Sequence, residues 1–175
     1  VSYNGALVKG ALSGKVYVNS PLKLQTALDL LQYVKENGHY VQVYMGDKLY
    51  VKEENEYSRM YAKISGIQAV AIGEEIYSIK EAPNKLLLMT ATENFEATWK
   101  DVEEKFKGRV DVTSSKDNYL ELMEPGVNKW QAVKSLAESF GIKPEEIMCI
   151  GDSINDLSMI KNAGIGVAVA NAKPQ

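Results

Sequence analysis

The chain has 175 residues, of which 45% are hydrophobic and 25% are charged, with a formal net charge of -3. Its charges are mixed in sign and form no block rich in Lys and Arg, which argues against a nucleic-acid partner. No apolar run approaches the ~20 residues that a membrane span needs, and nothing at the start resembles a signal peptide, so we expect a globular protein of the cytoplasm without membrane contact.

The chain begins at Val1 without a Met, on the apolar stretch "VSYNGALV" that leads into an Asn-Gly turn. It stops at "NAKPQ", just after another apolar run. We therefore expect a fragment of a longer protein.

Helical and strand-like segments alternate through residues 16–117. Ser20-Pro21 is a typical helix start, and apolar residues recur at helical spacing from there to Asn37-Gly38. Further helices are predicted over residues 54–64 and 95–106, and Gly46-Asp47-Lys48 predicts a hairpin turn. The predicted strands are 40–45, 49–51, 67–72, 85–90, 110–113 and 119–123. This mixture indicates an α+β layer of one sheet under two or three helices.

The last third has a different pattern. Asn128 predicts the start of a helix that ends at Gly141, and apolar strands are predicted over residues 147–150 and 165–169 with a short helix between them. Nearly continuous apolar strands that alternate with helices are typical of a parallel α/β sheet covered on both faces. In such sheets, ligands bind beyond the carboxyl ends of the strands.

Polar residues stand at the end of the first of these strands. Asp152 follows the strand directly and Asp156 comes one turn later, so both carboxylates can point into one crevice. Like charges this close favour a cation between them, and Mg²⁺ is the oxygen-seeking ion that one or two carboxylates commonly hold. Asn155 adds an amide that can orient these groups or donate to a phosphate. The alternative is that Asp152, Ser153 and Asn155 only cap and turn the chain into the next helix.

Lys129 stands in the first turn of the helix that precedes the acidic strand. The free N–H groups and the dipole of a helix N-terminus favour an anion there, and a lysine adds a compact positive charge for a phosphate. The alternative is an ordinary solvated lysine on the surface.

Several spaced motifs of the last third agree with one family. The segment "NKWQAVKSLAESFGIKPEEIMCIGDSINDLSMIKNAGIGVAVANA" resembles the haloacid dehalogenase superfamily, in particular its Cof-type phosphatases, and "YNGALV" is similar to the point where that family enters its cap. The resemblance implies an α/β fold, a partial Rossmannoid core with a parallel sheet and an inserted α+β cap domain. Its expected parts are residues 1–15 as a remnant of the core, 16–117 as the cap and 118–175 as the C-terminal part of the core.

The resemblance also implies roles for single residues. Asp152 is expected as a direct or nearly direct Mg²⁺ ligand, and Asp156 as a second residue of the metal site that orients its neighbours. Lys129 is expected to steady the nucleophile and the phosphoryl group, and Asn155 to contact the phosphate or a water on the metal. Asn4 near the mouth of the crevice and Asn171 after the last strand are expected as further phosphate-binding residues.

The family's reaction removes phosphate from a small phosphorylated metabolite, such as a sugar phosphate, through a phosphoaspartyl enzyme. Its nucleophile motif, Asp-x-Asp-Gly-[Thr/Val], does not occur in the 175 residues, and the nearest segment, "VDVTSS", has Thr113 in place of the second Asp. We therefore expect this chain alone to be inactive, and either to associate with itself or to pair with the missing N-terminal segment. The alternatives are a phosphomutase-like relative and a non-catalytic module that binds a metal or a partner.

Overall fold

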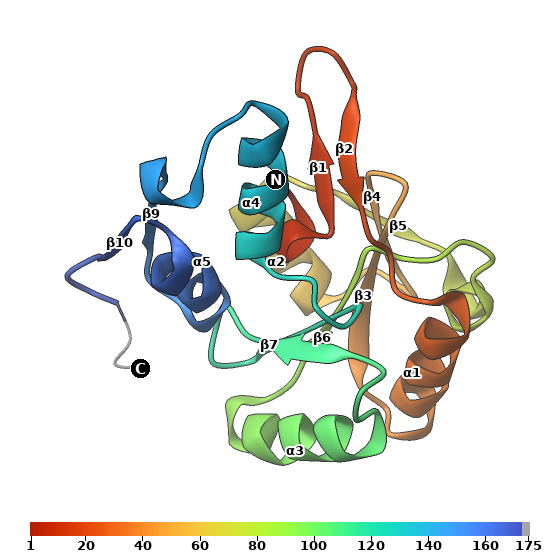
Figure 1. The fold of residues 1–175 in the computed structure, drawn as a ribbon. Helices are drawn as coiled ribbons and strands as arrows, with labels where there is room; N and C mark the ends of the chain where they lie inside the picture. Colours follow the sequence, from red (N-terminus) through yellow and green to blue (C-terminus); the bar gives the residue numbers. More distant parts are fainter. Residues whose placement is uncertain (173–175) are drawn as a thin grey trace.

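The computed structural model describes residues 1–172. A six-stranded sheet forms its largest layer, and a smaller α/β unit and a projecting hairpin lie beside it (Figure 1). The chain therefore has the expected α/β fold. No helix within residues 1–172 is long and apolar enough to cross a membrane.

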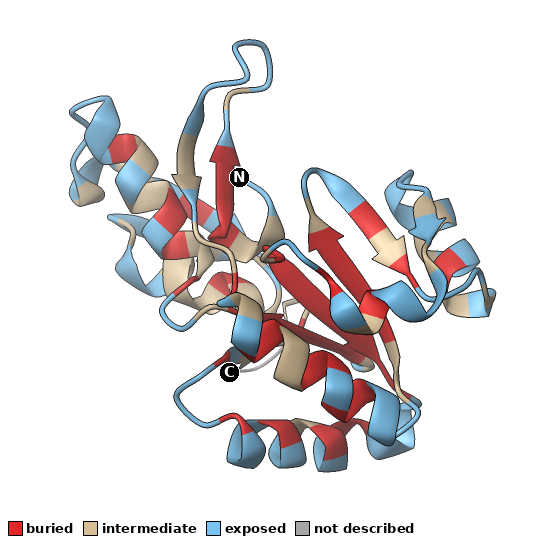
Figure 2. Cartoon of the chain, turned by 90° about the vertical axis from the view of Figure 1, so that its right-hand side faces the viewer, coloured by how far each residue is buried: buried red, intermediate tan, exposed pale blue. Residues whose placement is uncertain are grey.

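The large sheet is mixed. Its strands are β3 (Tyr40–Met45), β4 (Lys48–Val51), β5 (Ala69–Ala71), β6 (Lys85–Met89), β7 (Asp111–Thr113) and β8 (Tyr119–Met123). Their order is β5-β4-β3-β6-β8-β7, and all neighbours are antiparallel except the parallel pair β4 and β5. Every residue of the central strands β6 and β8 is buried, and the strands of the large sheet are mostly red, the colour of buried residues, in Figure 2.

Helices cover both faces of this sheet. Helices α1 (Leu24–Glu36) and α3 (Phe95–Lys105) pack on the face that carries Leu86, Leu88 and Leu120. Because successive strand residues point to opposite faces, Leu87 and Tyr119 lie on the other face, against tyrosines of α2 (Glu56–Ser65). Asn55 and Ser58 form a capping box at the start of α2, and Gly66 ends it in the left-handed conformation.

The expected start of the first helix at Ser20-Pro21 is wrong. Helix α1 begins at Leu24, because the preceding backbone is held in other hydrogen bonds. The Ser20 N–H donates to the Ala6 carbonyl at 2.8 Å, and the Leu22 N–H donates to the Pro83 carbonyl at 2.8 Å. These contacts keep residues 20–22 out of the helix.

The smaller unit follows the expected order of elements. It comprises α4 (Lys129–Ser139), β9 (Met148–Gly151), α5 (Leu157–Asn162) and β10 (Ile165–Ala168), and β9 and β10 pair in parallel. The expectation that this sheet is covered on both faces is wrong for the described residues. Met148, Ile150 and Ile165 are 58%, 55% and 54% exposed, so these strands present an apolar surface to solvent.

The N-terminal residues form a separate two-stranded sheet. A 3₁₀ turn over Tyr3–Gly5 leads into β1 (Leu7–Lys9), which pairs with β2 (Val16–Asn19) as the projecting hairpin in Figure 1. Strand β8 lies beyond the expected domain boundary at residue 117, yet it pairs with β6 and β7 inside the large sheet. The division into residues 1–15, 16–117 and 118–175 stays a prediction, and this pairing favours a later end for the cap.

Candidate functional site

The acidic loop after β9 is built around the Asp156 side chain. The Oδ2 atom of Asp156 accepts hydrogen bonds from the backbone N–H groups of Asp152 at 3.0 Å and Ser153 at 3.2 Å. Gly151 makes this packing possible, because a Cβ added there would lie 2.4 Å from the Cβ of Asp156. Asp156 therefore fixes the shape of the loop from within.

Lys129, on helix α4, contacts the acidic loop through its side chain. As the first residue of that helix, it follows Asn128, whose side chain caps the helix by accepting from the Gln131 N–H at 3.0 Å. The Nζ atom of Lys129 lies 2.5 Å from Oδ1 of Asp156 and 3.3 Å from Oδ1 of Asn155. The sequence predicted that Lys129, Asn155 and Asp156 serve one site, and the structure brings them into contact.

Charge and burial act in opposite directions on Asp156. Burial raises the pKa of its carboxyl, but the hydrogen bonds from Lys129 and from the loop backbone outweigh burial, so the pKa lies below its ordinary value. The side chain of Asp156 is only 7% exposed and both of its oxygens accept hydrogen bonds. In this arrangement, Asp156 orients the loop and the lysine, whereas Asp152 is the carboxylate that is open to a ligand.

Asp152 is exposed at the carboxyl end of β9, where its Oδ2 accepts from Ser153 Oγ at 3.1 Å. Within residues 1–172, no group of three or more His, Cys, Asp or Glu side chains is arranged to hold a metal ion. Mg²⁺ needs no such group, because it is commonly bound through one or two carboxylates, waters and phosphate oxygens. The exposed Asp152 carboxylate fits that mode of binding.

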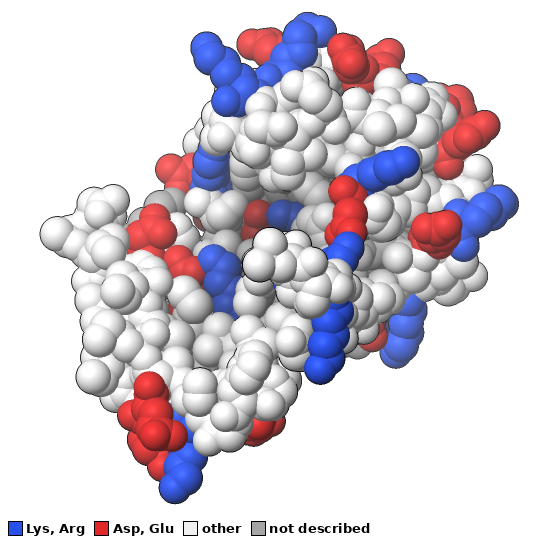
Figure 3. Space-filling view, turned by 90° about the horizontal axis from the view of Figure 1, so that it is seen from above, with Lys and Arg blue, Asp and Glu red and all other residues white. Residues whose placement is uncertain are grey.

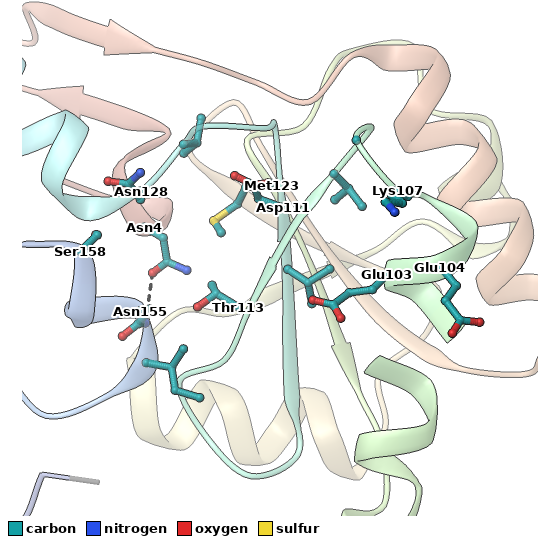
Figure 4. Close-up of a pocket in the computed structure, with 15 residues that line it drawn as sticks. Asn4, Glu103, Glu104, Lys107, Asp111, Thr113, Met123, Asn128, Asn155 and Ser158 are labelled. Atoms are coloured by element: carbon teal, nitrogen blue, oxygen red, sulfur yellow. Dashed lines mark hydrogen bonds between the residues drawn. The ribbon is translucent and has the colours of Figure 1, made fainter. Parts of the chain in front are cut away.

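Asn155 joins the acidic loop to the N-terminal turn. Its Nδ2 donates to Oδ1 of Asn4 at 3.3 Å, across 151 positions of sequence (Figure 4). Asn4 has a positive φ of 54°, which Asn tolerates better than most residues. The next residue, Gly5, packs so closely on α4 that an added Cβ would lie 2.4 Å from the Asn128 carbonyl oxygen.

Both asparagines face a cavity of about 560 Å³. Asn4, Asn128, Asn155 and Ser158 line one side of this cavity, and Glu103, Glu104 and Lys107 of the α3 end lie across from them (Figure 4). Basic and acidic side chains intermingle on the hollowed face in Figure 3. Asn171 lies in an exposed turn after β10 and, within residues 1–172, has no place in the hydrogen bonds around Lys129.

Sequence reasoning missed the residues behind Asn4. The Nδ2 of Asn4 donates to the buried carboxylate of Glu121, which also pairs with Lys85 at 3.2 Å. Lys85 begins the otherwise apolar strand "KLLLM", and Glu121 interrupts the otherwise apolar part of "YLELM". A charge at an inward position of a central strand is the signal that could have revealed them.

Comparison with known proteins identifies the fold family. The sequence pattern of the haloacid dehalogenase-like hydrolases matches residues 1–175. The chain belongs to this family. The expected Cof-type resemblance is thereby confirmed, together with the partly Rossmannoid α/β fold.

Individual proteins of known sequence or structure are similar to this chain over nearly all of its length. Phosphatase YwpJ of Bacillus subtilis is 26% identical over 99% of this chain and 69% of its own length. The crystal structure of TM0651 from Thermotoga maritima superposes with a TM-score of 0.82 and 33% identity, over 99% of this chain and 65% of that one. The sugar phosphatase BT4131 shares the fold at a TM-score of 0.79 and 22% identity, over 97% of this chain and 63% of that one. The chain thus spans about two thirds of the length of these proteins.

Proposed function

We propose that this chain supplies the cation- and phosphate-binding part of a Mg²⁺-dependent phosphatase that hydrolyses a small phosphorylated metabolite, such as a sugar phosphate. The observation that carries this proposal is the contact of Lys129 with Asp156 and Asn155, beside the exposed Asp152 carboxylate at the end of β9. Similarity to a phosphatase and to the fold of a sugar phosphatase supports the reaction class.

Each residue has a distinct part in this proposal. Asp152 would hold Mg²⁺, which when bound supplies positive charge for the phosphoryl oxygens. Lys129 adds a second positive charge and is itself held in place by Asp156. Asn155, which contacts Lys129, lines the cavity beside the acidic loop together with Asn4, whereas Lys129 and Asp152 do not line it. The amide N–H groups of the two asparagines suit oxygen atoms of a ligand that extends from the loop into the cavity.

The proposed reaction also needs a nucleophilic Asp, which none of the residues above supplies. The family's Asp-x-Asp pair does not occur among the 175 residues. We infer that a segment outside these residues supplies it, and that these 175 residues alone do not turn over phosphate esters. A covering segment would also bury the apolar surface of Met148, Ile150 and Ile165, which is more than half exposed here.

The test is release of phosphate from p-nitrophenyl phosphate and from a panel of sugar phosphates by the natural full-length gene product, with and without Mg²⁺. We expect Mg²⁺-dependent release, reduced about 100-fold or more by Asp152→Asn, and no release by the 175 residues alone. Asp47→Asn is the matched control, because Asp47 is a turn residue whose carboxylate pairs with Lys9. Phosphoryl transfer to a second sugar phosphate in place of water would favour the phosphomutase alternative, and no activity of either kind would overturn the proposal.

A further inference from the structure

A continuous chain of side-chain hydrogen bonds runs from the acidic loop to the centre of the large sheet. Lys129 Nζ donates to Oδ1 of Asn155 at 3.3 Å, and Nδ2 of Asn155 donates to Oδ1 of Asn4 at 3.3 Å. Nδ2 of Asn4 then donates to Oε2 of Glu121 on β8. Three segments that are far apart in sequence, namely the N-terminal turn, β8 and the acidic loop, are thus joined.

The residues at the two ends of this hydrogen-bond series fix the direction in which every bond of the series donates. A lysine ammonium at one end can only donate, and an ionised carboxylate at the other end can only accept. Both amides between them must therefore present oxygen toward Lys129 and nitrogen toward Glu121. Bonds aligned in one direction also polarise one another, which strengthens the whole series.

Glu121 is itself held from the other side. Its Oε1 accepts from Lys85 Nζ at 3.2 Å and from Ser115 Oγ at 3.0 Å. The side chains of Lys85 and Glu121 are 9% and 6% exposed, and Lys85 Nζ lies 4.6 Å from the centre of the Tyr44 ring. An ion pair this deeply buried is a poor source of stability, because apolar residues of similar volume commonly serve as well or better. The small contribution expected from the buried Lys85–Glu121 pair to stability favours a role of Glu121 beyond folding.

We propose that Glu121 is a positioning residue of the phosphoryl site. It lies behind Asn4 and does not line the cavity, whereas Asn4 and Asn155 do. By fixing the orientation of both amides, Glu121 makes the cavity wall present N–H groups, since each amide nitrogen carries a second hydrogen beyond the one used in the chain. The ligand class is an oxygen-rich anion, and this identification rests on the proposed function. The fixed orientation of the two amides is independent of the proposed function.

The first test measures orientation in the absence of substrate. The side-chain amide resonances of Asn4 and Asn155 are followed by ¹H–¹⁵N NMR in the full-length product, in Glu121→Gln, Asn4→Gly and the double variant. We expect Glu121→Gln to displace the resonances of both asparagines, because its amide can also donate and no longer enforces one direction. In the Asn4→Gly background, the same substitution should leave Asn155 unmoved, because the link is cut.

Glu124→Gln is the matched control, since Glu124 follows the same strand but pairs with Lys23 at the surface. It should leave both asparagines unmoved. If Glu121→Gln does not fold, Asn4→Gly still tests the Asn4–Asn155 bond on which the proposal depends, because Gly accepts the positive φ of residue 4 and leaves the Lys85–Glu121 pair intact. An Asn155 amide that is unmoved in Asn4→Gly, or moved equally by Glu121→Gln with and without Asn4, would overturn the proposal.

The second test is kinetic. With p-nitrophenyl phosphate, Glu121→Gln should lower kcat/KM by about 10- to 100-fold, as is typical for residues that orient a ligand-binding group. Because the NMR test needs no turnover, a protein without phosphatase activity but with coupled amides would refute only the proposed function. An active enzyme with uncoupled amides would refute only the positioning role of Glu121.

Discussion

The Nζ atom of Lys129 lies 2.5 Å from Oδ1 of Asp156, and this ion pair joins the first turn of α4 to the loop after β9. The pair orients a positive charge beside Asp152 without using the exposed carboxylate itself. It is therefore both a structural link and the source of the charge that we assign to phosphate binding.

Substitution of Lys129 by Met should lower the stability of the protein. The carboxylate of Asp156 is left buried without its partner, so the free energy of unfolding should fall by about 1–3 kcal/mol. Lys134→Met is the control, because Lys134 lies on the same helix in an exposed pair with Glu138 and should change stability by no more than about 0.5 kcal/mol. Urea unfolding at pH 7 measures both, and equal stabilities of the two variants would show that the pair does not stabilise the loop.

Gly151→Ala should displace Asp156. The new Cβ would lie 2.4 Å from the Cβ of Asp156 and 2.8 Å from its Oδ2, so the loop must shift. Gly141→Ala is the comparison: its φ of 72° costs about 1 kcal/mol for Ala, but no atom lies within 4 Å of the added Cβ. Both variants should lose stability in urea, whereas Mg²⁺ affinity by calorimetry should fall only in Gly151→Ala. Unchanged Mg²⁺ affinity in that variant would show that the site does not depend on this packing.

The single histidine should make stability depend on pH. Burial lowers the pKa of His39, and the nearby Asp101 carboxylate raises it only in part. Because unfolded His39 takes up its proton at a higher pH, near 6.5, than folded His39 does, the unfolded state binds more protons in this range. His39 should therefore reduce stability as pH falls below about 6.5 and have no such effect above it.

The lowered pKa of His39 that causes this effect can be measured on its ring protons by NMR. Asp101→Asn should lower the pKa of His39 further, because it removes the carboxylate that raises it. Asp47→Asn, at the hairpin turn, should leave the His39 pKa unchanged. A titration midpoint at or above 6.5 in the unchanged protein would contradict this account.

The exposed apolar surface of β9 and β10 predicts association of the 175-residue chain. Ile150 is 55% exposed within it, so Ile150→Lys should raise the monomer fraction in sizing chromatography across a range of concentrations. Ile64→Lys provides a matched control, because Ile64 is 62% exposed on α2. A monomer at every concentration in the unchanged chain would argue against self-association.

Local sequence patterns predicted much of the fold. The bounds of β3 and β8 agree with those predicted from their apolar and aromatic residues, and Asn128 caps α4 as expected. The start of α1 was wrong because distant backbone partners at Ala6 and Pro83 hold the residues before it, and a local helix signal contains no information about such partners.

The candidate site was predictable in part. The spacing of Asp152, Asn155 and Asp156 and the position of Lys129 pointed to one cluster, and the structure contains it. Glu121 could not be placed, because its role depends on the register that pairs it with Leu87 and on contact with Asn4, 117 positions away. The expectation for Asn171 had no comparable support.

The measurement that tests the central claim most directly is a Mg²⁺ titration of the full-length product, followed through the backbone amide resonances of Asp152 and Ser153. We predict saturable shifts at these two residues that Asp152→Asn abolishes and Asp47→Asn leaves intact. Shifts that persist in Asp152→Asn, or no shift at the acidic loop at saturating Mg²⁺, would contradict the assignment of this loop as the cation site.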